Sequence, residues 1–189
     1  LHSTDSETIQ SIKNYDVNII YQKNFGYGDA LIHGINQCKT KYFVIFNADG
    51  SFNPSELDKM HKSLDTKKLD FVFASRYDAN SGSDDDTLLT LIGNYIFTYI
   101  GKIFFRLNIN DILYTFIIGK TEQAKKLNLN QKDFSFCVEL PIKAKKMKME
   151  LGCINSYERK RIAGKKKVNA FKDGFLILKY MIKLFFMKS

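Results

Sequence analysis

The sequence predicts a single α/β domain: a mostly parallel sheet flanked by helices, followed by a basic helical C-terminal extension. Three observations support this fold class. Short apolar runs alternate with helical patterns, the links between them are short, and 189 residues with 44% hydrophobic composition can bury one sizeable core. Strand–helix–strand order with short links favours right-handed crossovers, and therefore parallel neighbouring strands.

The first part of the chain predicts three strands that alternate with two helices. In order, these are strand 17–21, helix 29–38, strand 42–46, helix 54–64 and strand 70–74. Gly26 and Gly28 open the first helix, and Pro54 suits the first turn of the second. Ligands of such sheets bind beyond the carboxyl ends of the strands, which draws attention to the residues after 46 and 74.

The second part begins with an acidic loop, 78–86, and a long apolar segment, 87–107. Asn94, Lys102 and Arg106 interrupt this segment, so it predicts a partly buried or interfacial helix instead of a membrane span. The remaining expected elements are strand 112–118, helix 134–148, strand 149–154, a basic loop over 159–167 and a terminal helix over 169–188.

Charge divides the chain into two parts of the same domain. Residues 1–119 hold 11 basic and 14 acidic side chains, whereas residues 120–189 hold 18 and 6, for net charges of −3 and +12. The basic part favours a polyanionic partner, such as phosphates or anionic lipid; a solvated lysine-rich surface is the alternative. Nucleic acid is not expected, because 159–167 lacks interleaved aromatic residues and any known binding motif.

The turn after residue 46 carries the first candidate site. Asn47, Ala48 and Asp49 follow a predicted buried strand, and Gly50 loosens the turn. A carboxylate there can bind Mg²⁺ or Mn²⁺, which takes one or two protein carboxylates and completes its shell with diphosphate oxygens and water. The alternative is an ordinary Asx turn at a strand end.

A second motif, Asn24, Gly26 and Gly28, follows a strand and opens a helix. It is not a dinucleotide-binding fingerprint, because the third glycine would fall at Leu31.

Taken in order, these motifs resemble the family 2 glycosyltransferases, which have the GT-A fold. The resemblance rests on Asn24-x-Gly26-x-Gly28-x-Ala30, on 46–50 with Pro54 and Leu57, and on 74–76. Later residues resemble the polyprenyl-phosphate sugar transferase branch, typified by dolichyl-phosphate mannose synthase; they are Gly93, Asn94, Asp111, Phe136, Glu139, Leu140, Arg161, Gly164 and Lys165.

The resemblance implies roles for individual residues. Asp49 matches the second acid of the family's Asp-x-Asp motif and Asn47 stands at the first, so both are expected metal ligands. Asp111 matches the acid that acts as a base on the acceptor phosphate or orients it. The expected donor and phosphate contacts are Asn24, Gly26, Gly28, Asn47, Ala48, Asp49, Ser51, Arg76, Arg161 and Lys165.

Two further expectations follow from the resemblance. The family's first strand, with its base-binding acids, is expected to precede Leu1, and His2 to Asp5 would be the tail of that turn. The expected reaction moves a sugar from a nucleoside-diphosphate sugar to a lipid phosphate. A saccharide or soluble acceptor, and a catalytically impaired nucleotide-binding homologue, remain the alternatives.

The terminal helix has a residue pattern that a membrane surface could bind. Lys172, Lys179 and Lys183 share one helical face, and apolar residues spread over much of the rest. Such a helix can lie in a lipid interface or pack on the domain core, and both interpretations stay open. The expected location is peripheral, at the cytoplasmic face of a membrane.

Overall fold

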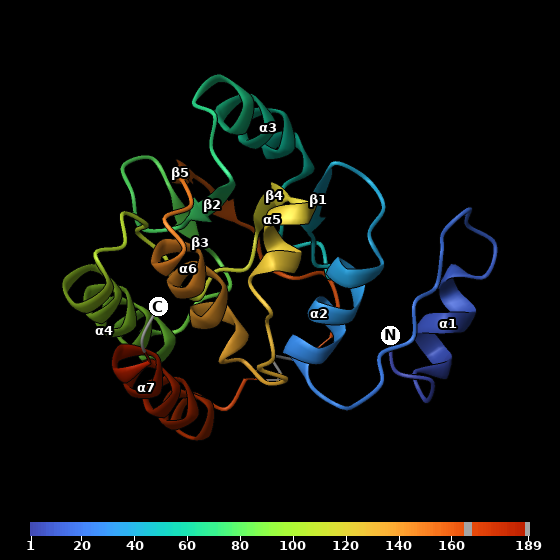
Figure 1. Cartoon of the computed structure of the whole chain (residues 1–189). Coiled ribbons are helices and arrows are strands. Elements are labelled where there is room, and N and C mark those ends of the chain that lie inside the picture. Colours follow the sequence, from blue (N-terminus) through green and yellow to red (C-terminus); the bar gives the residue numbers. More distant parts are fainter. Residues whose placement is uncertain (165–167, 188–189) are drawn as a thin grey trace.

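A computed structural model describes residues 1–164 and 168–187. The chain forms a central sheet covered by helices on both faces (Figure 1). The sheet strands are β1 (Tyr42–Ile45), β2 (Phe71–Ser75), β4 (Ile117–Lys120) and β5 (Leu151–Asn155). Two short strands, β3 (Gly82–Ser83) and β6 (Tyr157–Glu158), pair separately. The helices are α1 (Ser6–Ile12), α2 (Tyr27–Gln37), η1 (Pro54–Glu56), α3 (Leu57–Thr66), α4 (Leu88–Phe105), α5 (Thr121–Lys126), α6 (Phe136–Lys146) and α7 (Ala170–Phe186).

The sheet is mixed, so the expectation of a mostly parallel sheet is wrong. Its order is β1-β4-β2-β5, and β4 runs antiparallel to both β1 and β2, whereas β2 and β5 are parallel. The physical reason is that the segment before β4 lies at the carboxyl end of β2, where Asp111 pairs with Arg76, so β4 enters the sheet from that end and runs back between the two earlier strands. Apolar periodicity identifies a buried strand but does not give its direction.

Each face of the sheet has its own apolar core. Phe71, Phe73 and Ile117 face the larger core, which also includes residues of α2, α5, α6 and α7. Val72 and Ile118 face a smaller core that is closed by α3. This alternation follows from the two-residue period of a strand, and it explains why β2 is buried along its whole length.

Two predicted strands differ from the structure. Residues 17–21 form no strand, because their backbone bonds to Leu1 instead of the sheet: Ile20 O accepts from the Leu1 amino group at 2.9 Å, and Gln22 N–H donates to Leu1 O at 2.8 Å. The strand expected over 112–118 overlaps β4 only at residues 117–118, because residues 109–116 form an irregular, mostly buried segment. The other predicted strands and helices are confirmed, with ends shifted by a few residues.

The terminal helix packs on the domain core, as one of the two interpretations expected, and the lipid-interface interpretation stays a prediction. One stripe of α7 packs on the core through Ile177, Tyr180, Met181 and Leu184, while much of the rest of the helix is exposed. Its neighbours are α4 and α6.

Gly119 lies opposite Phe43 on one neighbouring strand and Phe71 on the other, and the lack of space between these rings gives the first prediction. A Cβ at this position would overlap the Phe71 ring and lie 2.9 Å from Cε1 of Phe43. We expect Gly119→Ala to lower the free energy of unfolding by about 2 kcal/mol, since overpacking forces the rings apart. Urea denaturation measures the change.

Gly34 in α2 supplies the control, since no atom lies within 4 Å of the position that a Cβ would take there, and Ala favours a helix interior. Gly34→Ala should be neutral or stabilising by up to about 1 kcal/mol. Equal effects of the two substitutions would contradict the packing described for Gly119.

Candidate functional site

The turn after β1 holds its carboxylate in a fixed position. Asp49 Oδ1 accepts the backbone N–H of Ser51 at 3.0 Å and the Ser51 hydroxyl at 2.7 Å. Gly50 adopts φ 84°, in the left-handed region that favours glycine. The Asx turn considered in the sequence is therefore present, and it leaves Asp49 Oδ2 to other partners. Asn47 and Ala48 lie in the same turn and are at least partly exposed.

Residues 159–162 pack on this turn and bring Arg161 to Asp49. Ile162 N–H donates to Asp49 O at 2.8 Å, and Arg159 N–H donates to Ser51 O at 2.9 Å. Arg161 Nη1 then lies 3.7 Å from Asp49 Oδ2. The other edge of the guanidinium, Nε and Nη2, binds Asp85 at 3.1 and 2.7 Å. The hydrogen bonds to Asp85 raise the pKa of Arg161, so its charge is fixed.

Arg76 and Asp111 form a buried bidentate ion pair near this turn. Arg76 Nε and Nη2 donate to the two oxygens of Asp111 at 2.7 and 3.1 Å, and Nη1 donates to Glu158 at 2.9 Å. Asp111 is 0% exposed. Asn94 of α4 donates to Asp111 Oδ1 at 2.6 Å. Burial opposes the charged form of Arg76, but Asp111 more than offsets it and raises the pKa of Arg76.

Aromatic and hydroxyl groups complete the surroundings of Arg76. Its guanidinium lies 4.5 Å from the ring centroid of Tyr114 and 5.1 Å from that of Tyr77, within cation–π range. The Tyr77 hydroxyl donates to Asp86. Ser83 of β3 donates to Glu158 of β6 at 2.6 Å, so the β3–β6 pair joins the acidic loop to the basic loop.

The glycine motif contacts a loop of the protein itself. A Cβ at Gly26 would fall on the carbonyl of Lys132, and one at Gly28 would fall on the carbonyl of Gln131. Asn24 closes the motif by donating from its backbone N–H and Nδ2 to Asp29 at 2.9 and 3.0 Å. These residues therefore have a packing role here. Their predicted donor contacts stay predictions.

Glu139 holds the far side of the same loop. It is 0% exposed and accepts N–H groups of Asn130 and Gln131, the Tyr180 hydroxyl at 2.9 Å and the Lys143 ammonium at 2.7 Å. The glycine motif, α6 and α7 are thus connected through one carboxylate.

The predicted site residues fall into three groups. Asn47, Ala48, Asp49, Ser51 and Arg161 come together at the β1 turn, Arg76 and Asp111 pair with each other, and Asn24, Gly26 and Gly28 pack at or near residues 131–132. Lys165 lies outside the described residues.

Sequence reasoning missed Asp85 and Glu158 as partners of the two arginines. The sequence pattern identifies 78–86 as an acidic loop but does not show what the loop binds. The excess of acids in 78–86 and of basic residues in 159–167 was the available signal.

Within residues 1–164 and 168–187, no group of three or more His, Cys, Asp or Glu side chains is arranged to hold a metal. The described ion-pair network has five carboxylates and two guanidiniums; its acids are Asp49, Asp85, Asp86, Asp111 and Glu158. This part of the site is therefore negatively charged.

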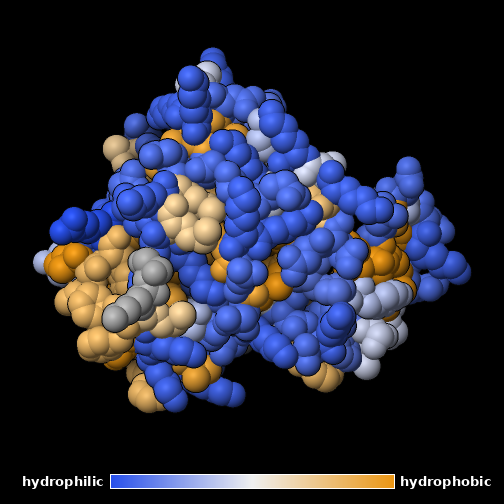
Figure 2. All heavy atoms as spheres, in the orientation of Figure 1, coloured by the Kyte–Doolittle hydropathy of each residue, from blue (hydrophilic) through white to orange (hydrophobic). Residues whose placement is uncertain are grey.

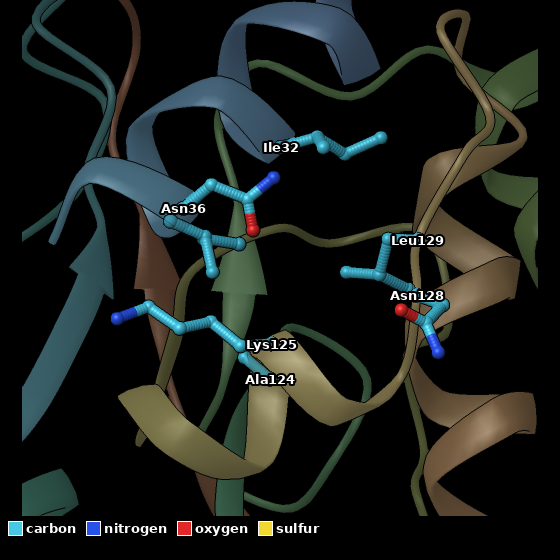
Figure 3. Close-up of a pocket in the computed structure, with 7 residues that line it drawn as sticks. Ile32, Asn36, Ala124, Lys125, Asn128 and Leu129 are labelled. Carbon is cyan, nitrogen blue, oxygen red and sulfur yellow. The ribbon is translucent and has the colours of Figure 1, made fainter.

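The surface of the domain has a groove along α4 and a smaller hollow between α2 and α5. A groove of about 540 Å³ runs along α4 next to the Arg76 network, and it is lined by Tyr77, Asp78, Tyr95, Ile96, Thr98, Tyr99, Lys102 and Asn110. A smaller hollow of about 190 Å³ lies between α2 and α5, where Ile32, Asn36 and Leu129 face one another (Figure 3). No predicted site residue lines the smaller hollow.

Comparison with known proteins identifies a family and shows structures with a similar fold. The family Glycosyl transferase family 2 matches residues 3–127. A crystal structure of a mycobacterial protein is similar with a TM-score of 0.68 at 12% identity, over 99% of this chain and 63% of that chain. Glucosyl-3-phosphoglycerate synthase from Mycobacterium tuberculosis has a TM-score of 0.60 at 12% identity, over 99% and 68%.

The same synthase in complex with Mn²⁺, uridine-diphosphate and glucosyl-3-phosphoglycerate has a TM-score of 0.63 at 12% identity, over 99% and 67%. This chain therefore spans about two thirds of the length of these structures. At 12% identity the likeness shows the fold, which is that of the expected GT-A class with a mixed sheet.

The buried pair generates the second prediction. Asp111→Asn keeps the shape of the side chain but leaves Arg76 without its charged partner, and breaking a buried ion pair costs about 3–5 kcal/mol. We expect a loss of about 3 kcal/mol in the free energy of unfolding, measured by urea denaturation. Asp58→Asn, in the exposed first turn of α3, is the control and should change stability by less than about 1 kcal/mol, because it removes at most a charge–dipole interaction. Equal stability of the two variants would contradict the structural role of Asp111.

Proposed function

Since this chain belongs to glycosyltransferase family 2, we propose that it transfers a hexose-type sugar from a nucleoside-diphosphate sugar to a polyprenyl-phosphate-type lipid. The observation that carries the donor half is the β1 turn. There Asp49 is fixed by Ser51 on one oxygen and lies beside Arg161 on the other. Residues 1–119 supply most of the proposed donor site and also helix α4, while residues 120–189 contribute Arg161 to the donor site and α7 to the membrane side.

The chemistry of the β1 turn fits a hard divalent cation. Asp49 offers a carboxylate and Asn47 an amide oxygen, which is the small protein donor set that Mg²⁺ or Mn²⁺ accepts when diphosphate and water complete its shell. When bound, such a cation neutralises charge on the leaving diphosphate. The described ion-pair network is negatively charged and would repel a diphosphate, which supports the proposal that a cation is needed at this turn.

Arg161 contributes the second positive charge of the donor site. Asp85 occupies the Nε and Nη2 edge of its guanidinium, which leaves the Nη1 edge on the Asp49 side. A guanidinium edge can bind phosphate oxygens through parallel N–H donors. Arg161 is therefore the phosphate clamp of the proposal, and Asp85 holds it in position.

In this proposal Asp111 is a positioning residue that fixes Arg76 and helix α4. Its two oxygens accept from Arg76 and Asn94, and it is fully buried, so an orienting role suits it better than that of a base. A phosphate acceptor is already anionic and needs little deprotonation.

The lipid half of the proposal is supported by the position of α4. The inner face of this helix supplies Asn94 to Asp111, and its outer face exposes apolar side chains such as Ile92 and Ile96. The groove lined by Tyr77, Tyr95 and Tyr99 lies along the same helix. An acceptor with a phosphate and an apolar chain would match the groove and the apolar outer face of α4, which lie along the same helix. The enzyme would then act as a peripheral protein at the cytoplasmic face of a membrane.

A soluble phosphorylated acceptor is the second candidate. It is favoured by the similar synthase structures, one of which contains phosphoglyceric acid with Mn²⁺ and uridine-diphosphate.

Substitutions at the β1 turn test the donor site. We expect Asp49→Ala to lower kcat/KM by about a hundredfold, because it removes the charged ligand of the cation. Asn47→Asp adds a second carboxylate and should strengthen Mn²⁺ binding by about tenfold. Mn²⁺ titration followed by electron paramagnetic resonance, with inorganic pyrophosphate present, measures affinity independently of turnover.

Asp58→Ala, an exposed acid on α3, is the matched control and should leave both quantities unchanged. Normal turnover and normal Mn²⁺ affinity in Asp49→Ala would reject the metal assignment.

A partition assay tests the acceptor. With labelled sugar nucleotide, membranes and Mn²⁺, we expect label to move into the organic phase as a sugar-phosphate lipid. Mild acid should then release the sugar, because the bond between a sugar's anomeric carbon and a phosphate is acid-labile. Label found only in water-soluble product would reject the lipid acceptor and favour the soluble one.

A further inference from the structure

Three stripes run along α7. Ile177, Tyr180, Met181 and Leu184 form the buried stripe. Lys172, Lys179 and Lys183 form a second, exposed stripe, because their spacings of seven and four residues return to the same side of a helix. The third stripe is apolar and exposed; it consists of Phe171, Phe175, Leu178, Ile182 and Phe185.

Helix α4 exposes a similar apolar stripe and lies against α7. Phe104 and Phe105 contact Phe185 at ring-centroid distances of 5.7 and 6.2 Å, and Phe97 lies beside Gly174. The joined outer faces are named the α4–α7 surface, and on α4 its apolar members include Leu89, Ile92, Ile96, Tyr99, Ile103 and Phe104. Figure 2 shows hydrophobic residues gathered over the region where Figure 1 draws these helices.

The charges on the α4–α7 surface are almost all of one sign. Helix α4 contains Lys102 and no acid. Helix α7 contains the three lysines and one acid, Asp173, which accepts the backbone N–H of Asn169 at the start of the helix. Apolar area bordered by cations is complementary to an anionic bilayer, whose headgroups attract lysine while its acyl region receives apolar side chains.

Helix α4 has the length and composition of a membrane span, with 18 residues, a mean hydropathy of 1.4 and 22% of the segment buried. Its inner face, however, is bonded to the domain. Asn94 donates to Asp111, and Thr98 Oγ1 accepts the Ile112 N–H at 3.2 Å. Crossing a bilayer would break these bonds, whereas lying in its surface leaves them intact.

We propose that the α4–α7 surface binds the surface of an anionic lipid bilayer, with both helices in the membrane plane. The proposal rests on the proposed function and deepens it, since it gives the surface through which the enzyme reaches a lipid acceptor. A second copy of the chain fits less well: the two helices carry four lysines and one acid, so a self-association through this surface would bring together like charges with too few acids to pair them.

Vesicle flotation of the whole chain tests the proposal. Vesicles of phosphatidylcholine alone are compared with vesicles containing about 30% phosphatidylserine, which gives a strong surface potential. We expect binding to the anionic vesicles that weakens with added salt. Replacing Lys172, Lys179 and Lys183 with Gln should weaken it about a hundredfold, at about fivefold per lysine. The control replaces three exposed lysines on α3 and at its C-terminal end, Lys59→Gln, Lys62→Gln and Lys67→Gln, and should change binding by less than about threefold.

Apolar variants test the other half of the surface. Phe175→Ser with Ile182→Ser should weaken binding at least about tenfold at any salt concentration, while thermal unfolding followed by circular dichroism stays unchanged, because both side chains are exposed. Failure of the wild-type chain to float with anionic vesicles would overturn the proposal. So would a dimer in solution that the apolar variants dissociate, or lysine variants that match the α3 control.

A water-soluble, short-chain polyprenyl phosphate separates this inference from the proposed function. Transfer to that acceptor without vesicle binding would reject the membrane surface and keep the enzyme activity. Vesicle binding without transfer to any lipid phosphate would keep the surface and reject the proposed acceptor.

Discussion

The ion pair between Arg76 and Asp111 is the interaction on which the arrangement of the site depends. It joins the end of β2 to the buried segment before β4, and Asn94 and Glu158 bring α4 and β6 to the same point. A buried charge is tolerated only with its partners in place, so each of these segments fixes the others. The polar inner contact of α4 thereby determines where its apolar outer face lies. The apolar surface of the protein and its ion-pair network are coupled through one helix.

The two arginines have different surroundings. Arg76 is enclosed by acids and by the rings of Tyr77 and Tyr114, which suits a permanent structural charge. Arg161 is bound along one edge by Asp85, and its other edge lies near Asp49. Arg76 is therefore held by the protein on several sides, whereas one edge of Arg161 lies beside the β1 turn; the phosphate contacts predicted for both arginines stay predictions.

Much of the fold could be predicted from the sequence, because α2, β1, β2, α4 and α6 have clear apolar patterns, and glycine or proline marks several of the turns between elements. The direction and position of β4 could not, since pairing is decided by tertiary contacts between distant residues. The strand predicted over 17–21 is wrong for a related reason: its apolar residues suit a strand, but its backbone bonds to Leu1. At the site, Asp49, Asp111, Arg76 and Arg161 were found through the family motifs. Their partners Asp85 and Glu158 were not, because they lie 76 and 82 positions from the arginines they bind.

The position of β4 has a consequence for how the chain folds during synthesis. Strands β1 and β2 leave the ribosome before β4 but are joined through it, and β4 comes more than forty residues after β2. Until then the edges of β1 and β2 that β4 will pair stay open, and open strand edges promote aggregation. The nascent chain should consequently depend on chaperone protection over this interval, and folding of the sheet should begin as a late, non-local event.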